Sequence, residues 1–465
     1  PGTGAFSRVV VNGTDGRLTA GGVLAPRLRG ITGAASNTYS PAIGRQFRVI
    51  SAAGGIAADS GFSGLTQPAG LMAGARFDAL YAPTSLSLIV TPTAYADLGS
   101  AGIAATPNQT AVGASLDASR PAAGLRMSVD RASVYYPLYG LSATELPAGL
   151  EALSPDIYAA GVMAVRQAWS QGAAAVGDQL AGRRGAPGSP AASSEGVTLW
   201  ADAFGQRTEF GGSGAAARTS VGGVIFGIDR TFGSGVAGIA VGIDDVRTDA
   251  AGGDSADGTL FQAVVYGGAR RGRAFVDWQA DYLRMDQDVT RSGGRFGASA
   301  KGGDTLEGAG GQINTGLGFT ARRWRIEPTV GLSLLRLTST ATTESGGATT
   351  ASIAGQRNHS LQSFAGVRLA RMVRLTPDLS LQMRGLFGWS HEMEDVNAEA
   401  RASLVRLGGP AFTVTSAPTG RDAAKLGASF SGQLTARVTV YGAYAAELAH
   451  DREAQQVSVG LRARW

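Results

Sequence analysis

The stretch VDWQADY at 276–282 alternates apolar and polar side chains with a period of two, which is the pattern of a β-strand with one apolar face. The same alternation recurs in IEPTVGLSL at 326–334 and in QVSVGLRARW at 456–465. In a water-soluble β protein such a face packs inward. In an outer-membrane barrel it points to lipid, and the polar face lines the lumen. The choice between the two depends on how many strands there are and how they are connected.

Runs of this kind predict about twelve strands after residue 195, an even number, each long enough to cross a bilayer at a tilt. The expected connections are short at 231–234, 321–323 and 435, and long at 207–219, 285–304, 338–358 and 392–420. A soluble sandwich has no reason to alternate in this way, whereas outer-membrane barrels do. The pattern therefore predicts a 12-stranded antiparallel transmembrane β-barrel over 196–465. The expected strands are 197–206, 220–230, 235–246, 258–268, 272–284, 305–320, 324–337, 359–370, 378–391, 421–434, 436–448 and 455–465.

The composition narrows the function classes. With Cys 0, a disulfide framework or a thiolate metal site is impossible, and His359, His391 and His450 leave little material for a histidine-based or metal-dependent enzyme. The net charge is +5, but the basic residues are scattered singly and form no stripe interleaved with aromatics, so a nucleic-acid partner is not predicted. We expect no cofactor and no metal. No run approaches the roughly 18 apolar residues that a spanning helix needs.

The first 195 residues divide into three segments. Residues 1–140 consist of short apolar runs broken by Gly, such as RVV at 8–10 and LSLIV at 86–90, at loose intervals of a few tens of residues. This pattern predicts a right-handed parallel β-helix, with a β-sandwich as the competing arrangement. Residues 141–183 are rich in Ala, Leu and Gln and predict a helix at 156–180. Residues 184–195 form a flexible linker rich in Gly, Pro and Ser.

The predicted helix at 156–180 is about 37 Å long at ~1.5 Å per residue, enough to thread a bilayer. It carries Arg166, Gln167, Gln171, Asp178 and Gln179, so it cannot face lipid. A polar lumen would suit it. The fold class is therefore all-β with one lumenal helix.

Several motifs, in this order along the chain, resemble those of type V secretion autotransporters. ATPNQ at 105–109 with ASLD at 114–117 resembles the junction that closes the passenger stem. EPTVGL at 327–332 resembles a mid-barrel strand, and WSHE at 389–392 resembles the end of a later one. FTV at 412–414 with GRDA at 420–423 resembles the segment that enters the third-last strand. The whole chain is similar to an autotransporter translocator domain with the end of its passenger attached.

The resemblance implies self-secretion. The barrel would lie in the outer membrane, anchor its own N-terminal passenger at the cell surface and keep the helix as a lumenal plug. Implied partners are outer-membrane lipid, the barrel-assembly machinery, periplasmic chaperones and the passenger itself, and the barrel would be monomeric. The last strand would carry the insertion signal, at Gly460, Leu461 and Trp465. The strand phases also give lumen-lining candidates, namely Asp202, Asp277, Asp281, Arg384, Lys425 and Glu447.

Two expectations concern processing. Some autotransporters cut an Asn–Asn bond in the lumenal helix, but residues 156–180 contain no Asn. We therefore expect passenger and barrel to stay joined. The chain opens at Pro1 without a charged-then-apolar leader, so a secretion signal would have been removed, or the chain is a fragment.

Two other functions compete with translocation. A hydrolase on the barrel rim could use His391 with Glu392, Glu394 and Asp395, or His450 with Asp451, because a His–carboxylate pair can activate a water. A passive pore is the second, although ordinary porins usually carry more strands and no such helix. GDS at 253–255 lacks the Leu that follows in a lipase motif, and GFSG at 61–64 lacks the spacing of a nucleophile elbow. We assign no catalytic residue and expect that the chain is not an enzyme.

Overall fold

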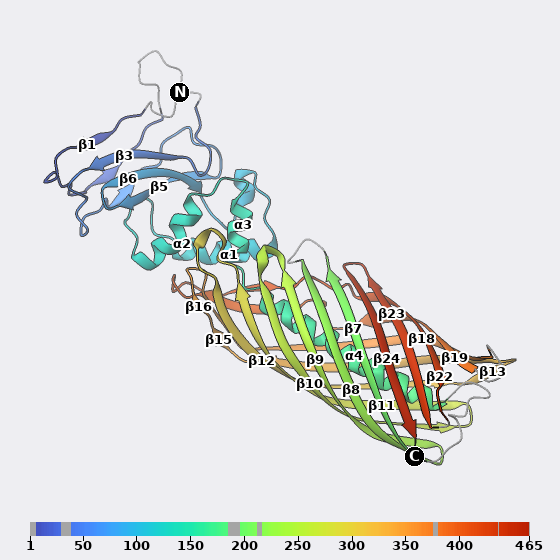
Figure 1. Cartoon of the computed structure of the whole chain (residues 1–465). Helices are drawn as coiled ribbons and strands as arrows, with labels where there is room; N and C mark the ends of the chain where they lie inside the picture. Colours follow the sequence, from blue (N-terminus) through green and yellow to red (C-terminus); the bar gives the residue numbers. More distant parts are fainter. Residues whose placement is uncertain are drawn as a thin grey trace.

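The computed structural model describes residues 6–28, 39–184, 196–211, 216–374, 380–435 and 437–464. Figure 1 shows two parts. One is a long β-barrel with a helix running inside it, and the other is a smaller N-terminal domain of strands and helices at one end of the barrel. The predicted linker beyond Arg184 and the predicted insertion residue Trp465 lie outside the described residues.

Twelve antiparallel strands form the barrel, and the last strand pairs with the first to close it. The predicted strands are confirmed to within a few residues. Most extend further toward the long loops than expected, because strand pairing continues through charged outward residues such as Arg207 and Glu209. In sheet order the strands are β7 (Gly196–Phe210), β8 (Ala217–Phe232), β9 (Gly235–Ala250), β10 (Ser255–Arg271), β11 (Ala274–Arg291), β12 (Ala300–Leu317), β14 (Trp324–Ser339), β18 (Gln356–Arg374), β19 (Ser380–Glu392), β22 (Asp422–Gln433), β23 (Val438–Ala449) and β24 (Arg452–Arg464).

The outer surface of the barrel carries the apolar half of each alternating strand. On β9, Ile239, Val241 and Ile243 are each about half exposed, while the residues between them point inward. Val457, Val459 and Leu461 form the same outward row on β24. An apolar surface this extensive is a lipid-facing belt rather than a water-exposed one. The phase predicted from the sequence is therefore confirmed.

The two ends of the barrel differ. Turns at 233–234, 272–273 and 434–437 join strands at one end, which we call the short-turn end; the short strand β13 (Phe319–Ala321) also lies there. The opposite end, called the mouth, bears the long loops. Segments of these loops form a four-stranded sheet of β15 (Thr342–Thr343), β17 (Ala351–Ile353), β20 (Glu399–Leu404) and β21 (Phe412–Thr415), and β16 (Ser345–Gly346) pairs with β12.

The N-terminal domain begins with parallel strand pairing. β1 (Val9–Val11) pairs with β3 (Gln46–Ala52), and β2 (Val23–Leu24) pairs with β4 (Gly64–Leu65). Two antiparallel strands, β5 (Ala75–Ala82) and β6 (Ser85–Pro92), then extend the β3 edge. The described residues thus show one stack of two successive chain passes, so the β-helix predicted over 1–140 stays a prediction.

Residues 107–139 correct that prediction, because they form helices where β-coils were expected. α1 (Pro107–Ser119) begins with a capping box in which the Thr106 hydroxyl accepts from Gln109 N and Gln109 Oε1 accepts from Thr106 N. Pro107 occupies the first turn, where its missing N–H costs nothing. At the start of α2 (Val129–Tyr139) the Ser128 hydroxyl accepts from Arg131 N, without the reciprocal bond of a capping box. Both caps are legible in the sequence, but short apolar runs gave the competing strand signal.

α3 (Leu146–Glu151) precedes α4 (Ile157–Arg184), the helix inside the barrel. The helix predicted at 156–180 is confirmed and runs four residues further. Its 28 residues span about 42 Å at ~1.5 Å per residue, from the mouth to the short-turn end. None of the helices in the described ranges is long and apolar enough to span a membrane.

Candidate functional site

The lumen is the candidate site, and α4 passes through it against the wall formed by β8 to β11. Small residues of α4 permit the close approach. A Cβ at Gly161 would lie 2.6 Å from Gln287 Oε1, and one at Gly172 would overlap the Gln262 side chain. The Ala- and Gly-rich composition of this helix is therefore explained by a narrow lumen rather than by helix propensity.

Charged groups fasten the end of α4 at the short-turn end. Arg184 donates to Asp277 of β11 and lies 3.2 Å from Glu327 of β14. Arg183 pairs with Asp229 of β8, which also accepts from Gln179 at 2.8 Å. Because these side chains are almost fully buried, removing one partner of a pair is expected to cost about 3–5 kcal/mol.

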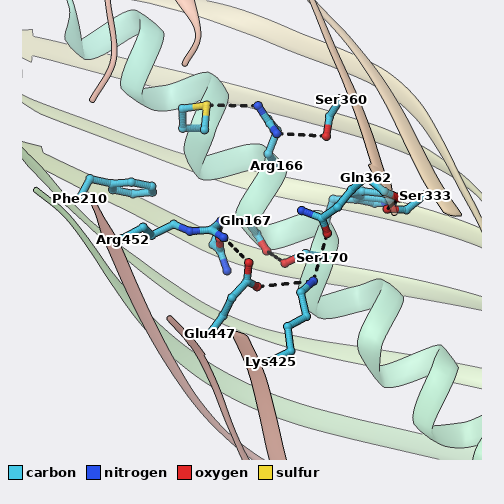
Figure 2. A pocket seen from close by; sticks show the side chains of 12 residues that line it. Arg166, Gln167, Ser170, Phe210, Ser333, Ser360, Gln362, Lys425, Glu447 and Arg452 are labelled. Atoms are coloured by element: carbon cyan, nitrogen blue, oxygen red, sulfur yellow. Dashed lines mark hydrogen bonds and ion pairs between the residues drawn. The ribbon is translucent and has the colours of Figure 1, made fainter. Parts of the chain in front are cut away.

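A second set of polar contacts lies nearer the mouth. Arg166 of α4 donates to Glu392 at 2.7 Å and to Ser360 at 3.0 Å. Figure 2 shows the neighbouring network, in which Glu447 accepts from Arg452 and lies 3.6 Å from Lys425 Nζ. The helix is thus bonded to the wall along its length, as a retained plug would be.

The lumen is not completely filled. A cavity of about 140 Å³ remains between α4 and the strands from β14 round to β7. Its lining includes Asp178 of the helix and the wall residues Arg368 and Arg384. This leftover space is small and interrupted by side chains, so the arrangement does not favour an open passive pore.

All six lumen-lining candidates occupy inward positions of their strands. Asp202 accepts from Tyr441 at 2.7 Å, and Asp281 accepts from Gln279 at 3.2 Å. Arg384 donates to Gln382 at 3.1 Å, and Asp277, Lys425 and Glu447 make the contacts described above. Of the six, Asp277 and Arg384 bond to α4 directly, Arg384 through the Asp178 carbonyl.

Sequence reasoning missed the residues that bond most firmly to the helix or close the mouth. Arg184, Arg291 and Glu344 were not singled out, and Glu327 was named only as part of the motif EPTVGL. For Glu327 a signal existed, because it is an acidic residue at an inward position of its strand. The partners of the others depend on which strands and loops meet in space.

The strands β23, β24 and β7 meet at the seam where the barrel closes. Tyr441, Gly460 and Asp202 lie opposite one another across these three strands. The Tyr441 side chain passes over Gly460 to reach Asp202, and a Cβ at residue 460 would overlap the ring. Leu461, the next residue, faces lipid. Gly460 therefore has a structural role in closure, beside the insertion role implied by the resemblance.

At the mouth, one arginine joins a strand, a loop and the approach to α4. The fully buried Arg291 of β11 donates to Glu344 at 2.8 Å, to Thr349 O at 3.2 Å and to Ala152 O at 3.0 Å. Glu344 is equally buried. Because both charges are removed from water, their pairing fixes the position of the chain as it enters the lumen.

The N-terminal domain is docked on the four-stranded sheet of β15, β17, β20 and β21, which we call the loop sheet. Asn108 of α1 donates to Thr415 O and accepts from Thr415 N, both at 2.9 Å, so its amide pairs with β21 as a neighbouring strand would. Ser115 donates to Pro410 O at 2.9 Å, and Arg406 lies 3.0 Å from Asp130. These contacts connect residues about 300 positions apart in sequence.

One buried carboxyl lies at this junction. Asn108 also donates to Asp156, 3.0 Å away, just before α4 begins. Burial is the main reason why the pKa of Asp156 is raised to about 7, and the neighbouring Glu151 contributes to the rise, while the hydrogen bond from Asn108 lowers the pKa. Burial at the docked junction thus favours the protonated form of Asp156.

The residues considered for a hydrolase at the mouth of the barrel contact other side chains or backbone groups. His391 Nδ1 lies 2.9 Å from Asp422, and Glu392 is bonded to Arg166. His450 is exposed beside Asp451, at 3.9 Å. Asp254 of the GDS motif accepts from Ser292 N. Among the described residues no group of His, Asp and Glu could hold a metal ion.

Comparison with known proteins agrees with this architecture. The autotransporter beta-domain family matches residues 199–445. The translocator domain of autotransporter NalP from Neisseria meningitidis superposes with a TM-score of 0.55 at 15% identity, covering 67% of this chain and 100% of that one.

Two further structures are less alike. The beta domain of the Bordetella autotransporter BrkA gives a TM-score of 0.44 at 17% identity, covering 58% and 100% of the two chains. The transport unit of AIDA-I from Escherichia coli gives 0.39 at 15% identity, covering 60% and 93%. No curated protein matches the sequence. With more than half of its length matched by the family and a closed barrel around a helix, the chain belongs to the autotransporter beta-domain family.

Proposed function

We propose that α4 is the last segment of the passenger to enter the barrel, that it stays there uncleaved, and that the N-terminal domain is the surface-exposed base of a β-helical passenger. As a member of its family the chain is an outer-membrane translocator that secretes its passenger. The observation that carries the proposal is the continuous path from the docked domain, past Ala152, through the lumen to Arg184.

The parallel pairing of the N-terminal domain supports the β-helical base. β1 pairs with β3, Leu18 with Ile56, and β2 with β4, which joins positions 41, 38 and 41 residues apart. A near-constant spacing is what successive coils of a β-helix produce. The antiparallel strands β5 and β6 and the helices α1 to α3 would then close the coil at the end facing the membrane.

Retention of the passenger rests on the helix itself. α4 contains no Asn, so the side-chain amide that an Asn–Asn cleavage would use is missing from the helix. The bonds from Arg166, Arg183 and Arg184 to the wall also hold the helix in place. A joined chain displays its passenger instead of releasing it.

The remaining parts of the proposal concern catalysis and assembly. The chain acts without a catalytic residue, because the carboxylates nearest His391 are engaged in structural pairs. The barrel-assembly machinery and periplasmic chaperones are its assembly partners, and the last strand, with Gly460, Leu461 and Trp465, is what that machinery recognises. The barrel works as a monomer.

Protease shaving of intact cells that express the chain behind a secretion signal tests this proposal. One antibody is raised against residues 46–140 and another against the turn at 434–437. We expect a full-length band before protease, loss of the first epitope on intact cells, and survival of the second until the membrane is broken. Protection of the first epitope until lysis would refute export. A separate barrel-sized band without protease, lost in a helix-cleavage-resistant variant, would refute retention alone.

A further inference from the structure

The short-turn end carries a ring of arginines that we call the arginine rim. They lie at outward strand positions, at the end of β18 or in turns: Arg230, Arg271, Arg273, Arg322, Arg323, Arg371, Arg374 and Arg437. All are exposed except Arg371, which is half-buried with its guanidinium 5.4 Å from the centre of the Trp324 ring. The rim directly continues the lipid-facing belt, because Trp324, Phe232 and Phe319 are exposed among its members.

Among the residues that the structure describes, no carboxylate lies on the outward face beside the rim. Within the described ranges, the acidic residues nearest to it in sequence are Asp229, Asp277 and Glu327, and each points into the lumen, where Arg183 or Arg184 pairs with it. None of the eight rim arginines makes an ion pair with another described residue. Arg273 and Arg371 contact only aromatic rings, at 5.6 and 5.4 Å.

The opposite end of the same surface is built differently. Above the belt, outward arginines and carboxylates alternate across neighbouring strands and pair with each other; we call them the collar. Arg207 and Arg218 lie 3.2 and 3.1 Å from Glu209, Arg247 lies 3.3 Å from Asp249, and Arg284 lies 2.5 Å from Glu307. The barrel therefore balances its charges at the mouth and leaves a net positive ring at the other end.

We propose that the arginine rim binds the phosphate groups of anionic phospholipids in the periplasmic leaflet of the outer membrane. Short turns lie on the periplasmic side of outer-membrane barrels, which places the rim at the headgroups of that leaflet. A guanidinium matches phosphate geometry with two parallel hydrogen bonds, and exposed aromatics among the arginines suit the interface. The phosphate groups of bound lipid would balance the positive charge of the rim arginines.

Binding of this kind would set the depth of the barrel in the bilayer. The rim surrounds the barrel, with arginines on β8, β10 and β18 and in the β10–β11, β13–β14 and β22–β23 turns, so lipids are held on several sides rather than at one point. The collar arginines, which are already paired with carboxylates, would add no such preference. Variants of the arginine rim therefore test the proposal, and variants of the collar serve as the control.

The test uses the full chain folded into vesicles of phosphatidylcholine containing brominated phosphatidylglycerol or, separately, brominated phosphatidylcholine. Tryptophan quenching by each lipid gives their relative association constant. A Trp389→Phe background removes the outward tryptophan near the mouth and leaves Trp278 and Trp324, which face lipid toward the short-turn end. Heat-modifiable migration in SDS gels verifies that each barrel is folded.

Two variants each remove four arginines. The rim variant is R271Q/R273Q/R322Q/R323Q, and the matched collar variant is R207Q/R218Q/R247Q/R284Q. We expect unmodified and collar proteins to prefer phosphatidylglycerol severalfold at low salt and the rim variant to fall to a ratio of about 1. Raising the salt should abolish the preference, whereas inorganic phosphate at equal ionic strength should compete no better than chloride.

Four results would overturn the proposal. One is an unmodified protein without any preference, which needs no variant to fold. Another is a rim variant that retains the preference. The third is an equal loss in both variants, which would mean that net charge alone attracts the lipid. Specific competition by inorganic phosphate would instead identify the rim as a site for free anions and also refute a lipid site.

Discussion

Substituting Gly460 by Ala tests the closure of the barrel most directly. Tyr441, Gly460 and Asp202 lie opposite one another on β23, β24 and β7, and the tyrosine hydroxyl donates to Asp202 at 2.7 Å. A methyl group at residue 460 would overlap the tyrosine ring and lie 2.5 Å from Ala201 O. The ring must then move away, and the buried Asp202 loses its hydrogen bond.

The size of the effect follows from two terms. A lost hydrogen bond to a charged group costs about 1.5–3 kcal/mol, and overpacking costs about 1–3 kcal/mol. We therefore expect Gly460→Ala to lower the free energy of unfolding by about 3–6 kcal/mol. Tyr441→Phe keeps the ring in place and removes only the hydroxyl, so it should lose about 1.5–3 kcal/mol.

The assay is equilibrium unfolding by urea of the barrel folded in vesicles, followed by heat-modifiable migration in SDS gels. Gly205→Ala is the matched control, because a Cβ there meets nothing within 4 Å. It should change the stability by less than about 0.5 kcal/mol. If Gly460→Ala were as mild as this control, the tyrosine would not close the seam, and the reasoning would be refuted.

Three further predictions concern the mouth, the docked domain and the lipid face. Arg291→Met leaves Glu344 buried without its partner and should cost about 3–5 kcal/mol, measured as faster proteolysis of the 340–355 loop in intact membranes; unchanged proteolysis would contradict it. Because burial raises the pKa of Asp156 to about 7, its contribution to docking is full below the ordinary pKa of Asp and is lost as the pH rises through 7. The protection factors of the α1 amides, which are exchange rates corrected for the intrinsic pH dependence of exchange, should therefore fall between about pH 5 and pH 8, and Asp156→Asn should remove that fall; a fall that persists in the variant would have another origin. Leu461→Arg, in the middle of the outward apolar row of β24, should cost about 2–4 kcal/mol in urea unfolding, whereas Gln455→Arg, beyond the row, should cost about 0–1 kcal/mol; equal costs would mean that the row does not face lipid.

Much of the fold could be predicted from the sequence because every second side chain of a lipid-facing strand is apolar, and this alternation shows which face of the strand points outward. The stretch at 276–282 was assigned to a strand with Trp278 outward and Asp277 inward, and both positions are as expected. The twelve strands and the helix inside the barrel follow from the same local patterns. The six lumen candidates were found because their strand phase is a local property.

The N-terminal helices show where local patterns conflict. Thr106 and Gln109 form a capping box whose residues were visible, yet the short apolar runs around them also fit β-coils. The choice depended on docking, since α1 presents Asn108 and Ser115 to the loop sheet about 300 residues away. The residues next to Asn108 and Ser115 in the sequence do not indicate such a long-range contact.

The sequence by itself determined that the chain is a lipid-facing barrel with a polar helix for its lumen, because side-chain alternation, strand number and turn length are all local. Only the tertiary structure decided which charges pair across the lumen, such as Arg184 with Asp277 and Glu327. It also decided which charges, such as those of the arginine rim, make no ion pair with another described residue. The physical reason is that pairing depends on the register of a closed sheet and on the rotation of the helix within it. Both are set by all twelve strands together.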